Sequence, residues 1–324
     1  MTKHAIGLII NPMAGRDIRR LVAYASLQSS PEKALAARRI LAGIAEVPDI
    51  EVLLPEDEHG FFAWIQSEVG GRVPIRLVPA PTGSDDSTVL WVNMLVDAGA
   101  QALVVVGGDG TQRNVAQAHP RVPVLPIAGG TNNVACYLGD QTAGGYAAAR
   151  YLALGLDPAE VGSRAKLCHV ALPNGHEELA LIDVALTRQN YTGAMAVWDP
   201  DDVQALVLAV ADAVRPGLSN VGGYDTPVAP ADDFGVFLKM GDEGRTTSAV
   251  LAPGLMVPFA ISEARVVAFD QPVSMSAGPG GATLALDGER TVVLRPGETT
   301  EVRIRRDGPL VLDPGLILAH AVRE

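Results

Sequence analysis

The chain has 324 residues, of which 48% are hydrophobic and 19% are charged, with 34 Gly and 23 Pro. This composition is that of a globular protein and excludes a disordered or collagen-like chain. The formal charge of −12 disfavours nucleic acid and anionic membranes as general partners, because the long-range field repels both. Any bound phosphate must therefore be held locally, by backbone amides, a few Arg or a metal; with 21 Arg and 4 Lys, we expect the side-chain contacts to be mostly guanidinium ones.

The length and the cysteine content indicate how many domains the protein has and in which compartment it works. A chain of this size is expected to hold about two domains of roughly 150 residues each. Cys136 and Cys168 form no CxxC pair, which favours a reduced, cytoplasmic protein. The apolar stretch near the N-terminus is too short for a signal peptide, and no stretch approaches the roughly 18 apolar residues of a membrane span.

Strand-like apolar runs alternate with helical patterns through the first part of the chain. Strands are expected at Ala5–Ile10, Glu51–Leu54, Ile75–Val78, Gln101–Val106 and Val122–Ile127. Helices are expected over Pro31–Val47, where apolar residues recur at helical spacing, and from about Asp85 to Ala98, where acidic residues favour a helix start. This alternation predicts an α/β domain with a parallel, doubly wound sheet.

From about Leu167 onward, short strand candidates are separated by Gly, Pro, Asn and Asp turns. They are Cys168–Leu172, Ala180–Leu186, Gly235–Met240, Ala264–Phe269, Thr283–Leu286, Thr291–Leu294 and Thr300–Arg305. One helix is expected at about Asp201–Val214. We therefore expect an α/β nucleotide-binding domain over residues 1–140 and a β-rich, β-sandwich-like substrate domain over residues 141–308.

A glycine-rich turn follows the buried strand that ends at Val106, and its residues are Gly107, Gly108, Asp109, Gly110 and Thr111. Glycines at the carboxyl end of a strand let the backbone turn sharply and present its amides to an anion. The carboxylate of Asp109 suits accepting a hydroxyl proton or holding a divalent metal, although a helix cap is the alternative. The Rossmann pattern is excluded because Arg113 stands at its third glycine, and the chain has no Gly-Lys pair for a P-loop.

Two further turns follow the neighbouring strands. One comprises Gly129, Gly130, Thr131, Asn132 and Asn133; the other comprises Asn11, Pro12, Gly15 and Arg16. The carboxyl ends of parallel strands meet at one sheet edge, so the turns after the 101–106 and 122–127 strands are expected side by side, with their amides forming one anion pocket. A connecting loop with Asx-type turns is the alternative for each turn alone. Arg16 and Arg113 are the best-placed cations, because each lies within three residues of a turn glycine.

In this order the turns resemble those of the superfamily that contains the NAD kinases and the diacylglycerol and sphingosine kinases. GGDGT at 107–111 is the superfamily's signature, and the NPxxG of the lipid kinases is matched at 11–15. Their GTxND is matched at 130–133, with Val134 in place of the Asp. Downstream, Asp287-Gly288-Glu289 matches a DGE hairpin tip that reaches back to the nucleotide, although Asp-Gly is also a hairpin turn in its own right.

The run at 11–26, together with GGTNN, is similar to the ATP-NAD-kinase-like group called acetoin-catabolism protein X, whose role suggests a small-molecule acceptor. NAD kinases continue GGDGT with apolar residues and carry an NxG-type segment next. This chain instead has Gln112-Arg113-Asn114 and Asn132-Asn133, which departs from the pattern for NAD recognition.

The resemblance implies an ATP-dependent kinase that uses Mg²⁺, with Asp109 as the base and with Asp287 and Glu289 on Mg²⁺ or substrate hydroxyls. The turn residues and the two Arg would bind ATP. It also implies that residues 309–324 pack back on the first domain. The implied partners are a nucleotide and a small-molecule acceptor; oligomers are common among the resembled proteins, and the sequence shows no interface.

The acceptor stays open among NAD, a small polyol or hydroxyketone, and a lipid of the diacylglycerol type. The charge and the lack of a basic amphipathic face argue against the lipid. A nucleotide-sensing protein without catalysis is the alternative from another class.

Overall fold

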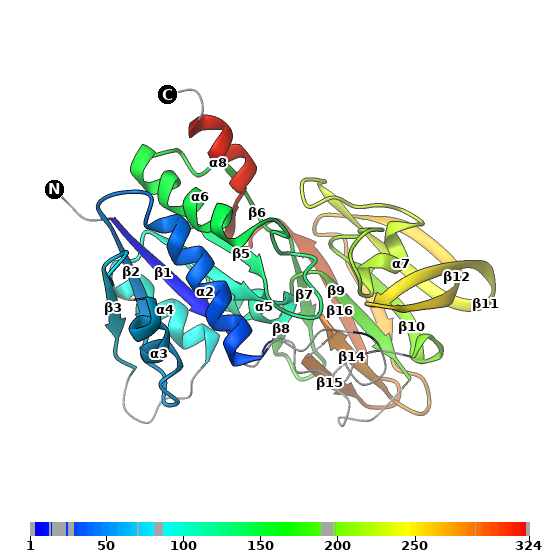
Figure 1. Cartoon of the computed structure of the whole chain (residues 1–324). Helices are drawn as coiled ribbons and strands as arrows, with labels where there is room; N and C mark the ends of the chain where they lie inside the picture. The colour runs from blue at the N-terminus through cyan, green and yellow to red at the C-terminus, as the bar shows by residue number, and fades with distance from the viewer. Residues whose placement is uncertain are drawn as a thin grey trace.

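The computed structural model describes residues 4–12, 14, 24, 29–69, 71–80, 87–188, 197, 199–288 and 290–321. The chain forms an α/β domain and a β-rich domain that lie side by side (Figure 1). The predicted fold class, with a mostly parallel sheet followed by antiparallel sheets, is confirmed.

A seven-stranded sheet, in the order β3-β2-β1-β4-β5-β17-β6, forms the centre of the first domain. Its strands are β1 (His4–Ile10), β2 (Ile50–Pro55), β3 (Ile75–Val78), β4 (Ala102–Gly107), β5 (Val124–Ala128), β6 (Gly162–Arg164) and β17 (Leu310–Leu312). Neighbours pair in parallel except β17 and β6, which are antiparallel. All six residues of the central β4 are buried, as expected for a strand covered on both faces. The five strands predicted for this part are confirmed.

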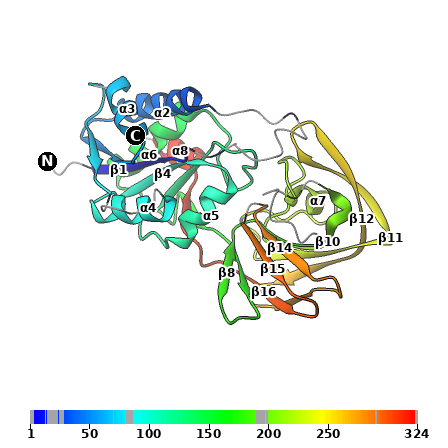
Figure 2. The ribbon, with the colours of Figure 1, turned by 90° about the horizontal axis from the view of Figure 1, so that it is seen from below.

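Helices cover both faces of this sheet, with α2 and α6 on one face and α4 and α5 on the other (Figure 2). The helices of the domain are α2 (Ser30–Ile44), α3 (Phe61–Val69), α4 (Thr88–Asp97), α5 (Asp109–Gln117), α6 (Gln141–Leu154) and α8 (Pro314–Ala321). The start of α2 is fixed by a capping box, in which Ser29 accepts from the N–H of Glu32 and the Glu32 carboxylate accepts from the N–H of Ser29. Helices α2 and α4 were predicted; α3 and α6 were not.

Glycines allow α2 and α6 to cross with their backbones in contact. A Cβ added to Gly145 would lie 2.1 Å from the carbonyl O of Ile40, a backbone atom that cannot move aside. We expect Gly145→Ala to lower the free energy of unfolding by about 1–3 kcal/mol, as for other overpacked sites. Urea denaturation checks this. Gly144→Ala is the matched control, because its Cβ meets first the Ile127 Cδ1 at 3.0 Å, the end of a flexible side chain. Equal effects of the two variants would contradict the argument.

The end of the chain returns to the first domain. Strand β17 lies between β5 and β6 in the sheet, and α8 packs against α6. The described part of the last segment, up to residue 321, thus lies against the first domain. Helix α6 and strand β6 also lie in the first domain, although both follow residue 140.

Two antiparallel sheets form the second domain, a six-stranded sheet of order β12-β11-β10-β9-β14-β15 and a four-stranded sheet of order β13-β16-β7-β8. Its elements are β7 (Leu167–Ala171), β8 (Glu177–Ala180), β9 (Asp183–Thr187), η1 (Pro200–Asp202), β10 (Val203–Leu208), α7 (Ser219–Gly223), β11 (Phe234–Ala252), β12 (Leu255–Ala268), β13 (Val273–Ser276), β14 (Ala282–Leu286), β15 (Arg290–Leu294) and β16 (Thr299–Arg305). One buried cluster takes residues from both sheets, such as Val184, Val207 and Val302, so the sheets pack face to face. None of the helices in the described residues combines the length and apolar character that a membrane crossing requires.

Two secondary-structure predictions for this domain are wrong. The helix expected at Asp201–Val214 is instead the strand β10, which pairs with β9 and β11 in the middle of the sheet. A short apolar run buried on both faces fits a central strand as well as a helix, and the sheet position decides between them. The strand expected over Ala180–Leu186 is divided into β8 and β9, which belong to different sheets. The break falls at Leu181 and Ile182, whose N–H groups bind a side chain instead of a neighbouring strand.

Candidate functional site

Three turns meet at the carboxyl edge of the parallel sheet. Asn11-Pro12 follows β1, the Gly107–Thr111 turn joins β4 to α5, and the Gly129–Asn133 turn follows β5. The side-chain amide Nδ2 of Asn11 donates to Thr111 Oγ1 at 2.8 Å, and the Asn11 N–H donates to the carbonyl of Val106 at 3.1 Å. The Asn11-Pro12 turn and the Gly107–Thr111 turn are therefore joined directly, at the edge where open α/β sheets bind their ligands.

The two glycine-rich turns touch each other. A Cβ on Gly108 would lie 2.7 Å from the carbonyl O of Asn132, and a Cβ on Gly130 would lie 2.5 Å from the Cα of Gly108. Only glycine permits this approach of two backbones. The expectation that these turns lie side by side is confirmed.

Asn133 makes hydrogen bonds inside the Gly129–Asn133 turn. Its Oδ1 accepts from the N–H groups of Gly129 and Gly130 at 3.2 and 3.0 Å, and its Nδ2 donates to the carbonyl of Gly130 at 2.8 Å. These amides are therefore engaged inside the turn. At the N-terminus of α5 the N-cap Gly108 makes no side-chain cap hydrogen bond, and the N–H of Asp109 donates to the carbonyl of Asn132 at 3.0 Å. The helix dipole favours an anion at such an end.

Asp109 is 4% exposed and stands in the first turn of α5. Its Oδ2 accepts from the N–H of Val134 at 3.0 Å, and its Oδ1 accepts from the N–H of Ala135 at 2.9 Å. The alternative that Asp109 caps α5 is wrong, since Gly108 is the N-cap. The carboxylate instead fixes Val134 and Ala135, which directly follow the Gly129–Asn133 turn.

Asp287 lies at the tip of the β14–β15 hairpin, where it has a φ of 51°. Its Oδ1 accepts from the N–H of Leu181 at 3.0 Å, of Ile182 at 2.7 Å and of Asp183 at 3.2 Å. The carboxylate is 3% exposed and ties the hairpin to the segment between β8 and β9. The Asp-Gly pair is thus a hairpin turn and a buried anchor at once.

An ion pair crosses between the domains at this point. The Nε of Arg113, on α5, lies 3.8 Å from Asp287 Oδ2, and both side chains are buried. Burial raises the pKa of Asp287 to about 7; the N–H groups of Leu181 and Ile182 and the Arg113 charge act in the opposite direction, and Asp109 adds to the rise. Arg113 Nε is buried without a hydrogen-bond partner in the structure. Two acidic groups and one basic group therefore lie buried near one another.

Of the predicted site residues, the structure gathers those of the three turns together with Arg113 and Asp287. These are Asn11, Pro12, Gly107, Gly108, Asp109, Gly110, Thr111, Arg113, Gly129, Gly130, Thr131, Asn132, Asn133 and Asp287. Gly15, Arg16 and Glu289 lie outside the described residues.

Arg215, which the sequence analysis did not single out, also reaches this site. It stands between β10 and α7 in the second domain, and its Nη1 donates to the carbonyls of Asn133 at 3.2 Å, Val134, and Cys136 at 3.1 Å. An Arg-Pro-Gly loop carries no motif that would have identified it. Only its contacts across the domain interface do so.

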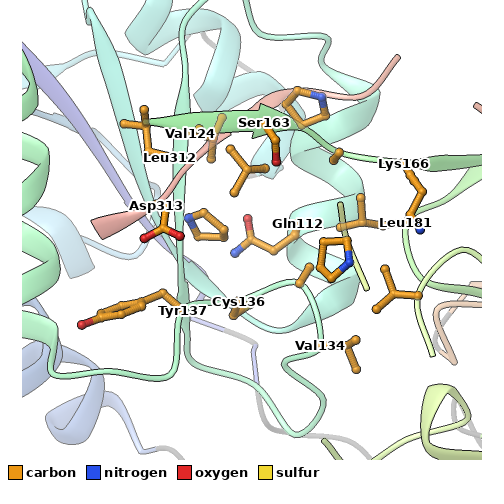
Figure 3. Close-up of a pocket in the computed structure, with 18 of the residues that line it drawn as sticks. Gln112, Val124, Val134, Cys136, Tyr137, Ser163, Lys166, Leu181, Leu312 and Asp313 are labelled. Atoms are coloured by element: carbon orange, nitrogen blue, oxygen red, sulfur yellow. The ribbon is translucent and has the colours of Figure 1, made fainter. Parts of the chain in front are cut away.

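A cavity of about 370 Å³ lies between the domains beside α5 (Figure 3). Gln112 and Cys136 lie near its middle in Figure 3, and Lys166 and Asp313 stand on opposite sides. Burial raises the pKa of the Cys136 thiol and nearby Asp109 raises it further, so the thiol stays protonated and is a poor nucleophile. Val134, whose N–H holds Asp109, lines the same cavity.

Comparisons with known proteins agree with this architecture. Residues 166–307 match the family described as Acetoin catabolism protein X C-terminal domain, and residues 56–146 match the family described as ATP-NAD kinase N-terminal domain. The chain is 27% identical over 333 residues to Acetoin catabolism protein X of Cupriavidus necator, covering 98% of this chain and 92% of that protein. The chain is a homologue of that protein.

Among solved structures, the chain is similar to yeast NADH kinase in complex with NADH, with a TM-score of 0.54 and 15% identity, over 100% of this chain and 87% of that one. At this identity the likeness shows a shared fold. The resemblance inferred from the three turns is confirmed, since the kinase-type match covers the first glycine turn and the acetoin-type match covers Asp287.

Proposed function

We propose that the chain is an ATP-dependent phosphotransferase that transfers a phosphoryl group to a hydroxyl of a small-molecule acceptor. The observation that carries the proposal is the meeting of the Asn11, Gly108 and Gly130 turns at one sheet edge, beside the buried Asp109 and Asp287. The matches to the ATP-NAD kinase and acetoin catabolism families, and the fold shared with an NADH kinase, support it.

Two buried polar atoms without partners support a proposed ATP site beside the N-terminus of α5. Arg113 Nε and Asn132 Oδ1 are both buried without a hydrogen-bond partner in the structure, and a buried polar atom left unpaired is costly. Both flank the N-terminus of α5, which no side chain caps. These groups suit the phosphates and hydroxyls of a nucleotide. The sequence motifs add Arg16, which lies outside the described residues, as a further expected phosphate ligand.

The described residues offer no ready set of metal ligands. They contain no group of three or more His, Cys, Asp and Glu side chains that could hold an ion. Asp109 and Asp287 already accept backbone N–H groups on their carboxylates. The assignment of Mg²⁺ to Asp287 and Glu289 therefore stays a prediction, and the steps proposed here do not depend on it.

Asp109 is proposed to orient the acceptor hydroxyl and to take its proton. Hydrogen bonds from Val134 and Ala135 to its two oxygens hold the carboxylate in a fixed orientation. Phosphoryl transfer places modest demands on the base, because positioning and charge stabilisation supply most of the catalysis. The proton of the hydroxyl would pass to Asp109 as the new O–P bond forms, and ADP would leave.

ADP release by the purified chain with ATP and Mg²⁺ tests the proposal across a panel of acceptors. The panel contains NAD, NADH, acetoin and related polyols, and dispersed diacylglycerol. We expect turnover with a polar small molecule, because the chain carries a net charge of −12 that disfavours an anionic surface. Turnover with diacylglycerol alone would overturn the choice of acceptor class, and NAD-dependent turnover would identify a nucleotide acceptor.

One observation favours a second candidate, a nucleotide-binding protein without turnover. Both buried carboxylates are held by backbone N–H groups, which suits a structural role as well as a chemical one. No turnover with any acceptor of the panel, together with ATP binding measured by calorimetry, would support this candidate. No turnover and no ATP binding would contradict both the phosphotransferase and the nucleotide-binding protein.

A further inference from the structure

Arg215 and Asp109 stand on opposite sides of the same short segment, Asn133–Ala135. The carbonyls of Asn133 and Val134 accept from Arg215 Nη1, and the next N–H groups along the chain, of Val134 and Ala135, donate to Asp109. The peptide groups Asn133–Val134 and Val134–Ala135 therefore each accept a hydrogen bond from the guanidinium through the carbonyl oxygen. Each also donates one to the Asp109 carboxylate through the N–H. Opposite charges at the two ends of aligned peptide dipoles strengthen both hydrogen bonds.

The guanidinium is itself held in place. Its Nε lies 3.3 Å from Asp212 Oδ2. Asn220, fully buried, donates through Nδ2 to the carbonyls of Asp212 at 3.2 Å and Arg215 at 3.1 Å, and its Oδ1 accepts from the N–H of Val250 at 2.8 Å. The loop that carries Arg215 is thus anchored to strand β11 of the second domain.

The same loop also touches the glycine turn. A Cβ on Gly217 would lie 3.1 Å from the side-chain Nδ2 of Asn132. Asn132 in turn accepts, through its carbonyl, the N–H of Asp109 at 3.0 Å. The second domain therefore reaches both segments that hold Asp109: Arg215 bonds the carbonyls of Asn133 and Val134, and Gly217 lies beside the side chain of Asn132.

We propose that Arg215 is a positioning residue, which fixes Asp109 through the Asn133–Ala135 segment and so makes the geometry of this carboxylate depend on contact between the two domains. Its effect on catalysis rests on the proposed function; the physical link does not. Arg113 crosses the interface in the other direction, from α5 to Asp287. Separation of the domains would release both carboxylates from their present surroundings.

Amide hydrogen exchange tests the link without any substrate. In Arg215→Gln we expect the N–H groups of Val134 and Ala135 to exchange roughly tenfold faster or more, because the loss of charged hydrogen bonds frees the segment. Leu181 and Ile182 serve as the internal control, since they bind Asp287 and should exchange as in the wild type. Arg121→Gln is the matched surface variant, because Arg121 pairs with Asp97 in solvent. Unchanged exchange at Val134 and Ala135 would overturn the proposal.

Kinetics with the acceptor found in the panel test the catalytic consequence. Arg215→Gln should lower kcat at least tenfold with little change in KM for ATP, and Arg215→Lys should restore part of it, because a Lys ammonium can still donate to the carbonyls. Equal loss in both variants together with faster exchange throughout the protein would mark a general folding defect and contradict the positioning role. Local loss of protection in a protein without turnover would instead leave the link standing and contradict the proposed function.

Discussion

Asp287→Ala should lower the free energy of unfolding by about 3–9 kcal/mol, because three buried N–H groups lose their acceptor and each unpaired donor costs about 1–3 kcal/mol. The donors are the amides of Leu181, Ile182 and Asp183, at 2.7 to 3.2 Å from Oδ1. Urea denaturation at neutral pH measures the change. Asp49→Ala is the matched control, since Asp49 is exposed and has a similar left-handed φ of 60°. An equally large loss in Asp49→Ala would assign the effect to the backbone conformation.

The same carboxyl group predicts a pH dependence with a definite sign. Burial raises the pKa of Asp287 to about 7 in the folded chain, from a value of 3.8 without these surroundings. The folded state therefore keeps a proton that the unfolded state releases, so the stability from this group is complete below about pH 4 and is lost as pH rises to about 7. Asn cannot ionise, so the stability of the wild type relative to Asp287→Asn should fall across this window. A difference that stays constant, or grows with pH, would contradict the raised pKa.

Asp109→Asn should lower turnover about a hundredfold or more, the usual contribution of a positioned general base. The structure adds a second effect. An amide NH₂ would face the N–H of either Val134 or Ala135, which leaves one donor unpaired and costs about 1–3 kcal/mol of stability. Turnover and unfolding must therefore be measured on the same preparation, at a temperature where the variant is folded.

Asp140→Asn is the control for Asp109→Asn. Asp140 also accepts two backbone N–H groups, from Thr142 at 2.8 Å and Ala143 at 3.3 Å, but it does so at the exposed start of α6. Asn caps a helix about as well as Asp, so this variant should stay near wild-type stability and keep its turnover. If Asp109→Asn loses stability but retains turnover, Asp109 is structural and the proposed base is wrong.

The strands of the first domain could be predicted because their signal is local. The continuous apolar run that ends at Val106 fits a strand buried on both faces, and the glycines after it mark the turn. Two other elements lacked such a signal. Helix α6 carries Gly144 and Gly145, which are poor helix formers, and the run at 203–208 became a strand only because β9 and β11 flank it.

The candidate site could be predicted only in part for a related reason. The motifs identified Asp109 and Asp287, but the groups that hold them are backbone N–H groups of Val134, Ala135, Leu181, Ile182 and Asp183. Any residue type supplies such a donor, so no sequence pattern reveals it. Arg215 was missed for the same reason, since its acceptors are carbonyls.

The place of β17 in the sheet has a consequence for how the chain is made. Among the described strands, β6 pairs with β17 alone, and β17 separates it from β5. Arg164, in β6, bonds the carbonyl of Gly308, which lies 144 positions later. During synthesis from the N-terminus, Tyr137 pairs with the end of β5 at Pro126 and Ala128 soon after that strand is made, whereas Val124 at its start meets its partner Val311 only when β17 has been translated. The start of β5 is therefore a site for wrong pairing until the whole second domain has been made, and the late arrival of β17 covers it.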